Sequence, residues 1–194
     1  AIVNIASVHS FATLGERIGY VTSKTAVLGL TRGMALNHGK DGIRVEASVG
    51  VTFRRIRATW TNEGRSSNGA YGIYPVSSQN VLVEDSFAEN ASDAGLYVGQ
   101  CRNVVVRRNR VTGNVAGLEI ENTQYADVYE NHAEDNTGGI VVFDLPGNPI
   151  VGRDVRLRDN TIVRNNRRNF APGGTVAEIP PGTGTFVMAS RRVV

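Results

Sequence analysis

The chain alternates hydrophobic and polar residues in short runs that return at nearly constant spacing. Each run is preceded by a glycine, and these openings fall at Gly42, Gly72, Gly95, Gly117 and Gly139, spaced by 30, 23, 22 and 22 residues, with a further opening at Thr185. A second apolar alternation follows each glycine opening, beginning at Val51, Val81, Val104, Ala126 and Val155. Period-two alternation is typical of β-strands, and a fixed period of this length indicates stacked structural repeats. The sequence therefore predicts a mainly β solenoid whose coils each contain at least two strands.

The same alternation assigns side chains to the inside or the outside of the solenoid. The predicted inward stacks are Ile43, Ile73, Leu96, Leu118 and Ile140, then Val45, Val98, Ile120 and Val142. The outward column beside them reads Arg44, Tyr74, Tyr97, Glu119 and Val141. Two long interruptions, residues 144–154 and residues 169–184, are rich in Pro and Gly and predict loops.

Polar residues recur after the second strand of each coil. One series is Ser86, Asn109, Asn131 and Asn160, and a second, five residues later, is Asn114, Asn136 and Asn165. Side-chain amides at the same bend of successive coils can hydrogen-bond to one another and to turn backbone. We expect an asparagine ladder that stabilises the solenoid.

Residues 1–45 follow another pattern, which reads as strand, helix and strand. Residues 1–6 form a β-branched apolar run, residues 20–38 place apolar side chains at helical spacing, and residues 43–45 form a second short strand. The unit predicts a βαβ crossover with parallel strands. We expect it to cap the open end of the solenoid, with Ala26, Val27, Leu30 and Met34 buried against Val45 and Ile73.

Composition narrows the function classes. No run of the 194 residues approaches the roughly 20 apolar residues that span a membrane. The net charge of +3 comes from residues 1–45, whereas residues 46–194 carry 16 arginines against 16 acidic residues, so we expect no nucleic-acid partner. The single cysteine, Cys101, fits a small packed position. We expect both ends of the chain to be truncated.

Residues 1–45 resemble the catalytic segment of short-chain dehydrogenases/reductases, through Ser7 in IVNIAS, Tyr20 and Lys24 in YVTSK, and the strand DGIRV. The resemblance implies that Tyr20 is the general acid or base, that Lys24 lowers its pKa and binds the nicotinamide ribose, and that Ser7 orients a carbonyl. It would imply NAD(P) as cofactor. The chain lacks the glycine-rich turn and the later acidic residue that bind a dinucleotide, so we expect no cofactor and an inactive fragment.

Residues 42–194 resemble a bacterial right-handed parallel β-helix repeat protein of pectate-lyase-like architecture, through runs such as NGAYGIYPV, NVAGLEIENT and NTGGIVVFDLPG. The tetrapeptide GIRV suits both families, so we interpret the chain as a chimera joined near residues 42–45, whether natural, artefactual or designed. The β-helix resemblance implies a periplasmic or secreted protein and the dehydrogenase resemblance a cytoplasmic one, which leaves the localisation open.

Candidate binding residues lie on the outward side of the first predicted strand of each coil. Aromatic rings stack on sugar rings and carboxylates accept hydroxyl hydrogen bonds, which indicates a sugar-binding groove at Tyr74, Tyr97, Glu119, Glu121 and Phe143, with Asp144 beside them. The alternative is an ordinary solvated sheet face. Arg54, Glu84 and Arg107 form an outward column that we interpret as structural.

Other chemical groupings are weaker. Asp127, Tyr129, Glu130 and His132 are close enough in sequence for acid–base chemistry in a lyase or an epimerase. The acidic residues Asp85, Glu89, Asp93 and Asp135 are too scattered for a calcium loop, and His9, His38 and His132 too dispersed for zinc, so we predict no metal site.

The sequence favours polysaccharide or glycan binding or processing by the solenoid. An NAD(P)-dependent oxidoreductase and a structural or interaction solenoid without catalysis stay open as alternatives. The oligomeric state and the identity of a glycan do not follow from the residues.

Overall fold

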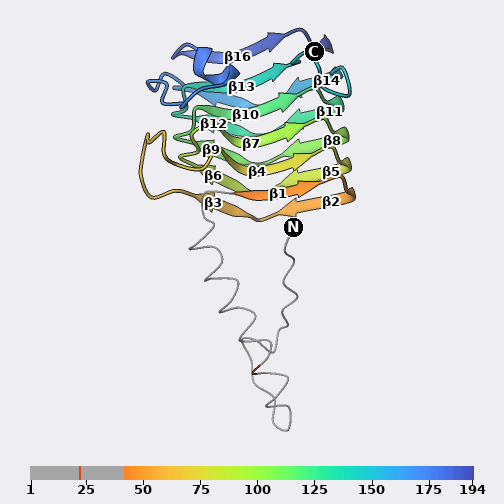
Figure 1. The fold of residues 1–194 in the computed structure, drawn as a ribbon, viewed down its shortest axis with the longest axis horizontal. Helices are drawn as coiled ribbons and strands as arrows, with labels where there is room; N and C mark the ends of the chain where they lie inside the picture. The colour runs from red at the N-terminus through yellow and green to blue at the C-terminus, as the bar shows by residue number, and fades with distance from the viewer. Residues whose placement is uncertain (1–21, 23–41) are drawn as a thin grey trace. The chain divides into compact units, whose positions relative to one another are not determined.

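The computed structural model describes residue 22 and residues 42–194. Residues 42–194 form one compact unit, a β-solenoid in which three parallel sheets run along the stack of coils (Figure 1). The predicted β class and parallel stacking are confirmed. The proposed capping helix lies outside the described residues, as do Ser7, Tyr20 and Lys24.

Each full coil contributes one strand to each sheet. Sheet A has the order β1-β4-β7-β10-β13-β16, formed by β1 (Ile43–Glu46), β4 (Tyr71–Val76), β7 (Ala94–Gly99), β10 (Ala116–Glu121), β13 (Gly138–Phe143) and β16 (Thr183–Met188). Sheet B is formed by β2 (Val49–Arg54), β5 (Gln79–Glu84), β8 (Arg102–Arg107), β11 (Gln124–Tyr129), β14 (Arg153–Arg158) and β17 (Arg191–Val193). Sheet C is formed by β3 (Arg57–Thr59), β6 (Phe87–Glu89), β9 (Arg110–Thr112), β12 (His132–Glu134) and β15 (Thr161–Val163). The third, short strand of each coil was not predicted, because three residues are too few to show a period.

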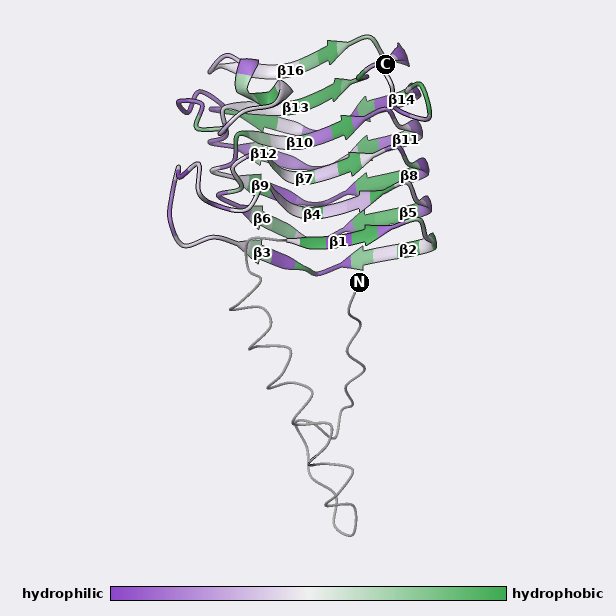
Figure 2. Ribbon diagram, in the orientation of Figure 1, coloured by the Kyte–Doolittle hydropathy of each residue, from purple (hydrophilic) through white to green (hydrophobic). Residues whose placement is uncertain are grey.

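The core is built from inward stacks that run through all three sheets. Ile73 pairs with Leu96, and Leu118 lies between Leu96 and Ile140, so the predicted stack is in register. These side chains are fully or almost fully buried. Hydrophobic residues recur along the strands of successive coils, whereas hydrophilic residues gather at the turns on the right-hand edge (Figure 2). Burial of each large side chain contributes roughly 1.5–3 kcal/mol.

Two asparagine ladders stabilise the bends, as predicted. Asn109 Nδ2 donates to Asn131 Oδ1 at 3.0 Å, and Asn131 Nδ2 donates to Asn160 Oδ1 at 3.0 Å. In the second ladder, Asn114 Nδ2 donates to Asn136 Oδ1 at 3.0 Å, and Asn136 Nδ2 to Asn165 Oδ1 at 2.9 Å. Backbone N–H groups of the preceding coil use the same acceptor oxygens.

The second ladder and the close stacking of coils explain the repeated glycines. A Cβ at Gly95 would lie 2.6 Å from Asn114 Nδ2, and a Cβ at Gly117 would lie 3.0 Å from Asn136 Nδ2. At Gly117 the carbonyl oxygen of Gly139 in the next coil lies closer still, at 2.6 Å, and at Gly72 the carbonyl oxygen of Gly95 lies at 2.5 Å. The close stacking of successive coils, together with the ladder at Gly95, therefore leaves room only for hydrogen at these positions.

A third ladder, which the sequence reading missed, lies at the bend between sheets A and B. Ser48 N–H donates to Ser78 Oγ at 3.1 Å, Ser78 N–H to Cys101 Sγ at 3.4 Å, and Cys101 N–H to Thr123 Oγ1 at 3.3 Å. The sequence pattern did not reveal this ladder, because its members are of three different residue types. Cys101 is fully buried, and burial raises the pKa of its thiol to about 11.

Two insertions extend from the solenoid at the predicted places. One joins Phe143 to Arg153, and the other joins Val163 to Thr183 and contains the short 3₁₀ helix η2 (Thr175–Glu178). A third connection, residues 60–70, accounts for the longer spacing between the first two glycine openings.

Replacing Asn136 by Ala tests the ladder. The change leaves the buried Asn114 amide and backbone N–H without their acceptor, and we expect the free energy of unfolding to fall by at least about 2 kcal/mol in urea denaturation. Asn166→Ala is the matched control, because Asn166 is exposed, and it should change the value by less than about 0.5 kcal/mol. Equal effects of the two variants would contradict a stabilising ladder.

Candidate functional site

The outer face of sheet A brings together carboxyl and aromatic side chains from successive coils. In register, Glu119 lies between Tyr97 of β7 and Val141 of β13, and Glu121 lies beside Phe143. Tyr97, Glu119, Glu121 and Phe143 are all buried, whereas Tyr74 is partly exposed. The structure thus gathers the five predicted binding residues on one face and leaves only Tyr74 partly open.

Three tyrosines form one aromatic cluster on this face. The Tyr71 ring centroid lies 4.6 Å from that of Tyr97 and 5.2 Å from that of Tyr74. The Arg44 guanidinium carbon lies 5.9 Å from the centroid of Tyr74. Because Tyr71 and Tyr74 are only partly buried, the cluster presents aromatic surface toward solvent.

Asp93, immediately before β7, forms a hydrogen-bonded pair with Glu119, and Tyr71 also hydrogen-bonds to Asp93. Burial raises the pKa of Asp93 from 3.8 to about 6. Burial, with the neighbouring charge of Asp93, raises the pKa of Glu119 well above its ordinary value. Two carboxyl groups in contact cannot both ionise without mutual repulsion, so each raises the pKa of the pair and favours retention of one proton between them.

The pair is buried at its oxygens. Among the described residues, no N–H or O–H donor other than a proton between the two carboxyl groups reaches Asp93 Oδ1 or Glu119 Oε2. Such atoms are costly to bury and often mark a site that a ligand completes. Asp93 itself is partly exposed, so the pair is reached from the Asp93 side.

Glu121 lies beside this pair and has three polar partners. Gln100 Nε2 and Asn148 Nδ2 each donate to Glu121 Oε1 at 2.8 Å, and Tyr97 also hydrogen-bonds to the carboxyl group. Burial raises the pKa of Glu121, although these hydrogen bonds oppose the shift.

Asp144 has a structural role. Its carboxylate accepts hydrogen bonds from Gly152 N–H and the Ser190 hydroxyl, and these contacts hold the insertion that follows β13.

A covering segment, residues 169–182, packs over the outer face of sheet A. Its Val176 and Ile179 share an apolar cluster with Tyr97, Val141 and Phe143. The segment is held by its own contacts: Asn169 Nδ2 donates to the carbonyl oxygens of Val176 at 2.8 Å and Ile179 at 2.9 Å. Phe143 therefore packs as a core residue under this segment.

An apolar pocket of about 210 Å³ adjoins the covering segment. Its lining residues are Phe143, Thr175, Glu178, Ile179, Pro180, Phe186 and Met188.

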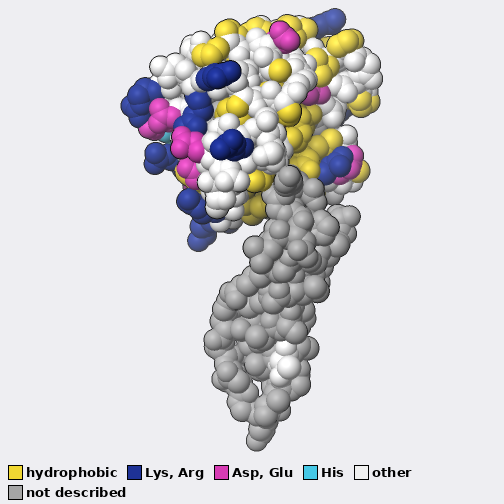
Figure 3. All heavy atoms as spheres, turned by 60° about the vertical axis from the view of Figure 1, so that its left-hand side comes forward, with side chains coloured by type: hydrophobic (Ala, Val, Ile, Leu, Met, Phe, Trp, Pro, Cys, Tyr) yellow, Lys and Arg dark blue, Asp and Glu magenta, His cyan; other side chains and the backbone are white. Residues whose placement is uncertain are grey.

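Figure 3 shows the molecule after rotation that brings sheet C forward. Hydrophobic side chains lie toward the right of this view, and basic and acidic side chains alternate along its left edge.

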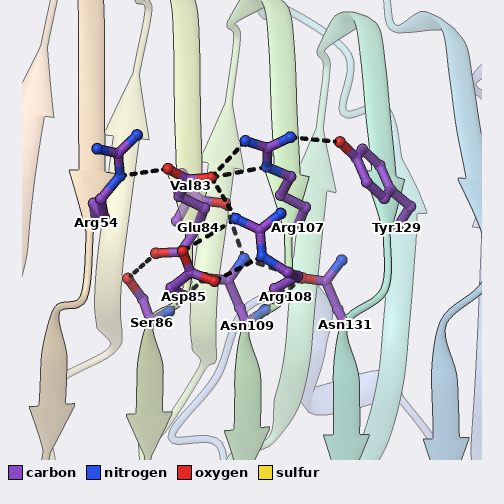
Figure 4. Close-up of polar contacts among 10 residues, drawn as sticks. All are labelled: Arg54, Val83, Glu84, Asp85, Ser86, Arg107, Arg108, Asn109, Tyr129 and Asn131. Carbon is purple, nitrogen blue, oxygen red and sulfur yellow. Dashed lines mark hydrogen bonds and ion pairs between the residues drawn. The ribbon is translucent and has the colours of Figure 1, made fainter.

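The outer face of sheet B carries an ionic cluster centred on Glu84 (Figure 4). Arg54 and Arg107 from the flanking strands both contact Glu84, with Arg107 Nη2 at 2.7 Å, and Arg108 Nη2 lies 2.8 Å away. Hydrogen bonds from Arg107 and Arg54 lower the pKa of Glu84 despite its burial. Arg107 Nη1 also donates to the Tyr129 hydroxyl at 3.0 Å. The column of Arg54, Glu84 and Arg107 thus links neighbouring coils through ion pairs, which agrees with a structural role for these residues.

The residues between 127 and 132 do not converge on one point. Asp127 pairs with Arg158 at 3.3 Å on sheet B, whereas His132 contacts Glu134 on sheet C. Glu130 is exposed at the bend between them.

Within the described residues, no group of three or more His, Cys, Asp or Glu side chains is arranged to hold a metal ion. No helix among these residues is long and apolar enough to cross a membrane.

Asp93 and Tyr71 were not among the predicted site residues. Asp93 was considered only as one of several scattered acidic residues. The alignment of the repeats could have predicted the position of Asp93. Tyr71 of β4 pairs with Ala94 of β7, so Asp93, the residue before Ala94, lies next to the column of tyrosines.

Family comparison agrees with the stacked coils. The model of the right handed beta helix region matches residues 32–192. The chain belongs to the right-handed β-helix family. A short chain dehydrogenase model matches residues 1–54, so the β-helix carries a dehydrogenase-like segment at its N-terminal side.

Two curated relatives match that segment. Levodione reductase of Leifsonia aquatica is 44% identical over 46 residues, which is 24% of this chain and 17% of the relative. A-factor type gamma-butyrolactone 1'-reductase (1S-forming) of Streptomyces virginiae is 43% identical over 61 residues, which is 31% of this chain and 24% of the relative. The chain thus spans a quarter or less of either reductase. No solved structure matches the chain.

The carboxyl pair predicts a pH dependence of stability. The unfolded chain holds Asp93 near its ordinary pKa of 3.8, whereas the folded β-helix raises it to about 6, so the folded state binds more protons between these values. Stability contributed by this group is therefore lost as pH rises through that window. Since Glu119 shifts in the same direction, Glu119→Gln, which mimics the protonated form, should raise the melting temperature above pH 6 and have little effect near pH 4.

Glu130→Gln provides the control, because Glu130 is exposed at a bend. Melting curves from pH 4 to 8 should show no pH-dependent difference for this variant. A lower melting temperature of Glu119→Gln at pH 7.5 would show that Glu119 is ionised and stabilising, contrary to the shared-proton account.

Proposed function

We propose that the β-helix binds an uncharged segment of a polysaccharide on the outer face of sheet A and processes it by acid–base chemistry. The observation that carries the proposal is the carboxyl pair of Asp93 and Glu119, retained with raised pKa values beside a partly exposed tyrosine cluster. A carboxylic acid that keeps its proton near neutral pH is suited to general acid catalysis. Tyr71 and Tyr74 supply ring surface on which a sugar can stack.

The charge of sheet A favours an uncharged sugar. Strands β4, β7, β10, β13 and β16 contain no lysine or arginine, whereas β10 contributes Glu119 and Glu121. The basic residue of sheet A, Arg44 of β1, is paired with Glu46 at 2.8 Å. A uronate carboxylate would therefore meet the acidic groups of β10 without an unpaired basic partner from the strands, and like charges in a partly buried site repel. Sugar hydroxyl groups can instead donate to the carboxyl oxygens.

Glu119 and Glu121 are the carboxyl pair that this proposal assigns to hydrolysis. Asp93 and Glu119 are in hydrogen-bond contact, which is closer than the spacing of roughly 5–9.5 Å at which two carboxyl groups flank a glycosidic bond. Glu121 follows two residues later on the same face, about 6.6 Å along the strand. In this scheme Glu119 protonates the leaving oxygen, Glu121 activates water, and Asp93 maintains the protonated state of Glu119.

The covering segment sets a condition on catalysis. Glu119 is only 2% exposed, so a sugar can first contact Asp93, Tyr71 and Tyr74, and reaches Glu119 when residues 169–182 move aside. Binding and turnover are therefore separable in experiment.

Affinity electrophoresis on a panel of neutral polysaccharides tests the binding step. The unaltered protein should be retarded by at least one neutral glycan, and Tyr74→Ala should weaken that retardation by about tenfold, since a stacked ring contributes on the order of 1–2 kcal/mol. Tyr125→Ala is the matched control, because Tyr125 is an exposed tyrosine on sheet B and should leave retardation unchanged. Loss of retardation in both variants would contradict a site on sheet A.

Reducing-end release from the retained glycan tests the chemical step. Glu119→Gln should preserve retardation and abolish release, whereas Glu130→Gln should preserve both. Retardation without release by the unaltered protein would show a binding module, and absence of retardation with every glycan would favour a structural solenoid.

An oxidoreductase is the second candidate, favoured by the dehydrogenase match over residues 1–54, which includes Ser7, Tyr20 and Lys24. The sequence lacks a glycine-rich dinucleotide turn, so these residues do not fit a complete NAD(P) site and no hydride step is derived from them. Enhanced NADH fluorescence on titration with the protein would support this candidate.

A further inference from the structure

The apolar pocket lies at the end of sheet A, between the covering segment and strands β13 and β16. Phe143 of β13 pairs in register with Met188 of β16, and Phe186 lies on the same face of β16, two residues earlier. Ile179 and Pro180 of the covering segment also line the pocket. Phe186 and Met188 are 37% and 38% exposed, so an aromatic ring and a thioether meet solvent at neighbouring positions.

Hydrogen bonds hold the walls of the pocket in place. Asn169 Nδ2 donates to the carbonyl oxygens of Val176 and Ile179, which fixes the backbone of η2. Thr183 Oγ1 donates to the Pro180 carbonyl oxygen at 2.8 Å and joins the covering segment to the start of β16. The volume of about 210 Å³ exceeds the roughly 150 Å³ of an engineered cavity that binds benzene, so an aromatic ring with a short arm fits.

The charged residue of the pocket lining is acidic. Glu178 is exposed, and its carboxylate has no hydrogen bond or ion pair among the described residues. The covering segment and strands β13 and β16 contain no lysine or arginine, so the elements that form the pocket supply no cation to it. An anionic ligand would be repelled by this carboxylate, whereas a cationic ligand would gain a partner.

We propose that the pocket binds a small arylalkylammonium ion, with its ring against Phe186 and Met188 and its ammonium group at Glu178. Aromatic rings attract both a second ring and a nearby cation, and a thioether packs favourably against a ring. An ammonium group has three N–H donors, which a carboxylate can accept. The site uses neither carboxyl group of the Asp93 and Glu119 pair, so it does not depend on the function proposed for that pair.

The tyrosine cluster is another place on sheet A where aromatic rings lie near carboxyl groups, but it fits an ammonium ion less well. The Arg44 guanidinium carbon lies 5.9 Å from the Tyr74 ring centroid, so this cluster already has a cation. Glu119 is only 2% exposed, and burial raises its pKa, which disfavours the ionised form that an ammonium group needs. Glu178 is open to solvent at the pocket and has neither restriction.

Methyl-carbon NMR of protein labelled at its methionine methyl groups tests the proposal, because the chain has two methionines, Met34 and Met188. Met188→Leu assigns the two signals. Three ligands of similar size are titrated at neutral pH: phenethylamine as the cation, 2-phenylethanol as the neutral molecule and 3-phenylpropionate as the anion. Glu178→Gln removes the proposed charge partner, and Glu130→Gln, at an exposed bend, is the matched control.

We expect phenethylamine to shift the Met188 signal to saturation, with a dissociation constant of about 1 mM or below, as befits a ligand of this size. It should bind at least about threefold more tightly than 2-phenylethanol, since an ammonium group gains both the carboxylate and the ring faces. Glu178→Gln should bring the two affinities within about 1.5-fold of each other, whereas Glu130→Gln should leave the preference unchanged.

Four results would overturn the proposal. They are the absence of a saturable shift of the Met188 signal, equal affinities of phenethylamine and 2-phenylethanol in the unaltered protein, tighter binding of 3-phenylpropionate than of phenethylamine, and an unchanged preference in Glu178→Gln. Tyr74→Ala should leave the titration unchanged. Loss of the shift in that variant would place the ammonium ion at the tyrosine cluster and would also contradict the pocket site.

Discussion

In-register stacking of buried amides is the constraint on which the other features depend. Asn114, Asn136 and Asn165 each occupy the same bend, and every amide must find its acceptor one coil away. The close approach of Asn114 excludes a Cβ at Gly95, and the Gly139 carbonyl of the next coil excludes one at Gly117. A coil that slipped by one residue would lose its ladder contacts and turn its core side chains outward.

That register gives the outer faces their chemistry. Because parallel strands repeat at the same positions, single residues from successive coils form columns, and each column has its own character. On sheet A the columns place Tyr97 beside Glu119 and Gly99 beside Glu121. On sheet B they place Arg153 beside Arg191. The β-helix therefore presents an acidic and aromatic face and a basic face on one scaffold, although residues 46–194 carry no net charge.

Much of the scaffold could be predicted from the sequence, because its information is local and repeated. The inward stack through Ile73 and Leu118 and the Asn109 and Asn114 ladders follow from spacing alone, and the contacts confirm them. The carboxyl pair could not be predicted in this way. Asp93 reaches Glu119 from the preceding coil, and Tyr97 and Val141, which flank Glu119 in register, pack against Val176 and Ile179 of a segment far along the chain. The capping role of residues 1–40 stays a prediction.

A carboxyl-carbon NMR titration of Asp93 and Glu119 tests the central claim most directly, with Glu119→Gln used to assign the two signals. The account predicts that Asp93 titrates near pH 6 and that Glu119 stays protonated well above the ordinary range of a glutamate. If both signals instead titrate together near pH 4, as independent solvated carboxyl groups do, the shared proton and the acid–base function built on it are contradicted.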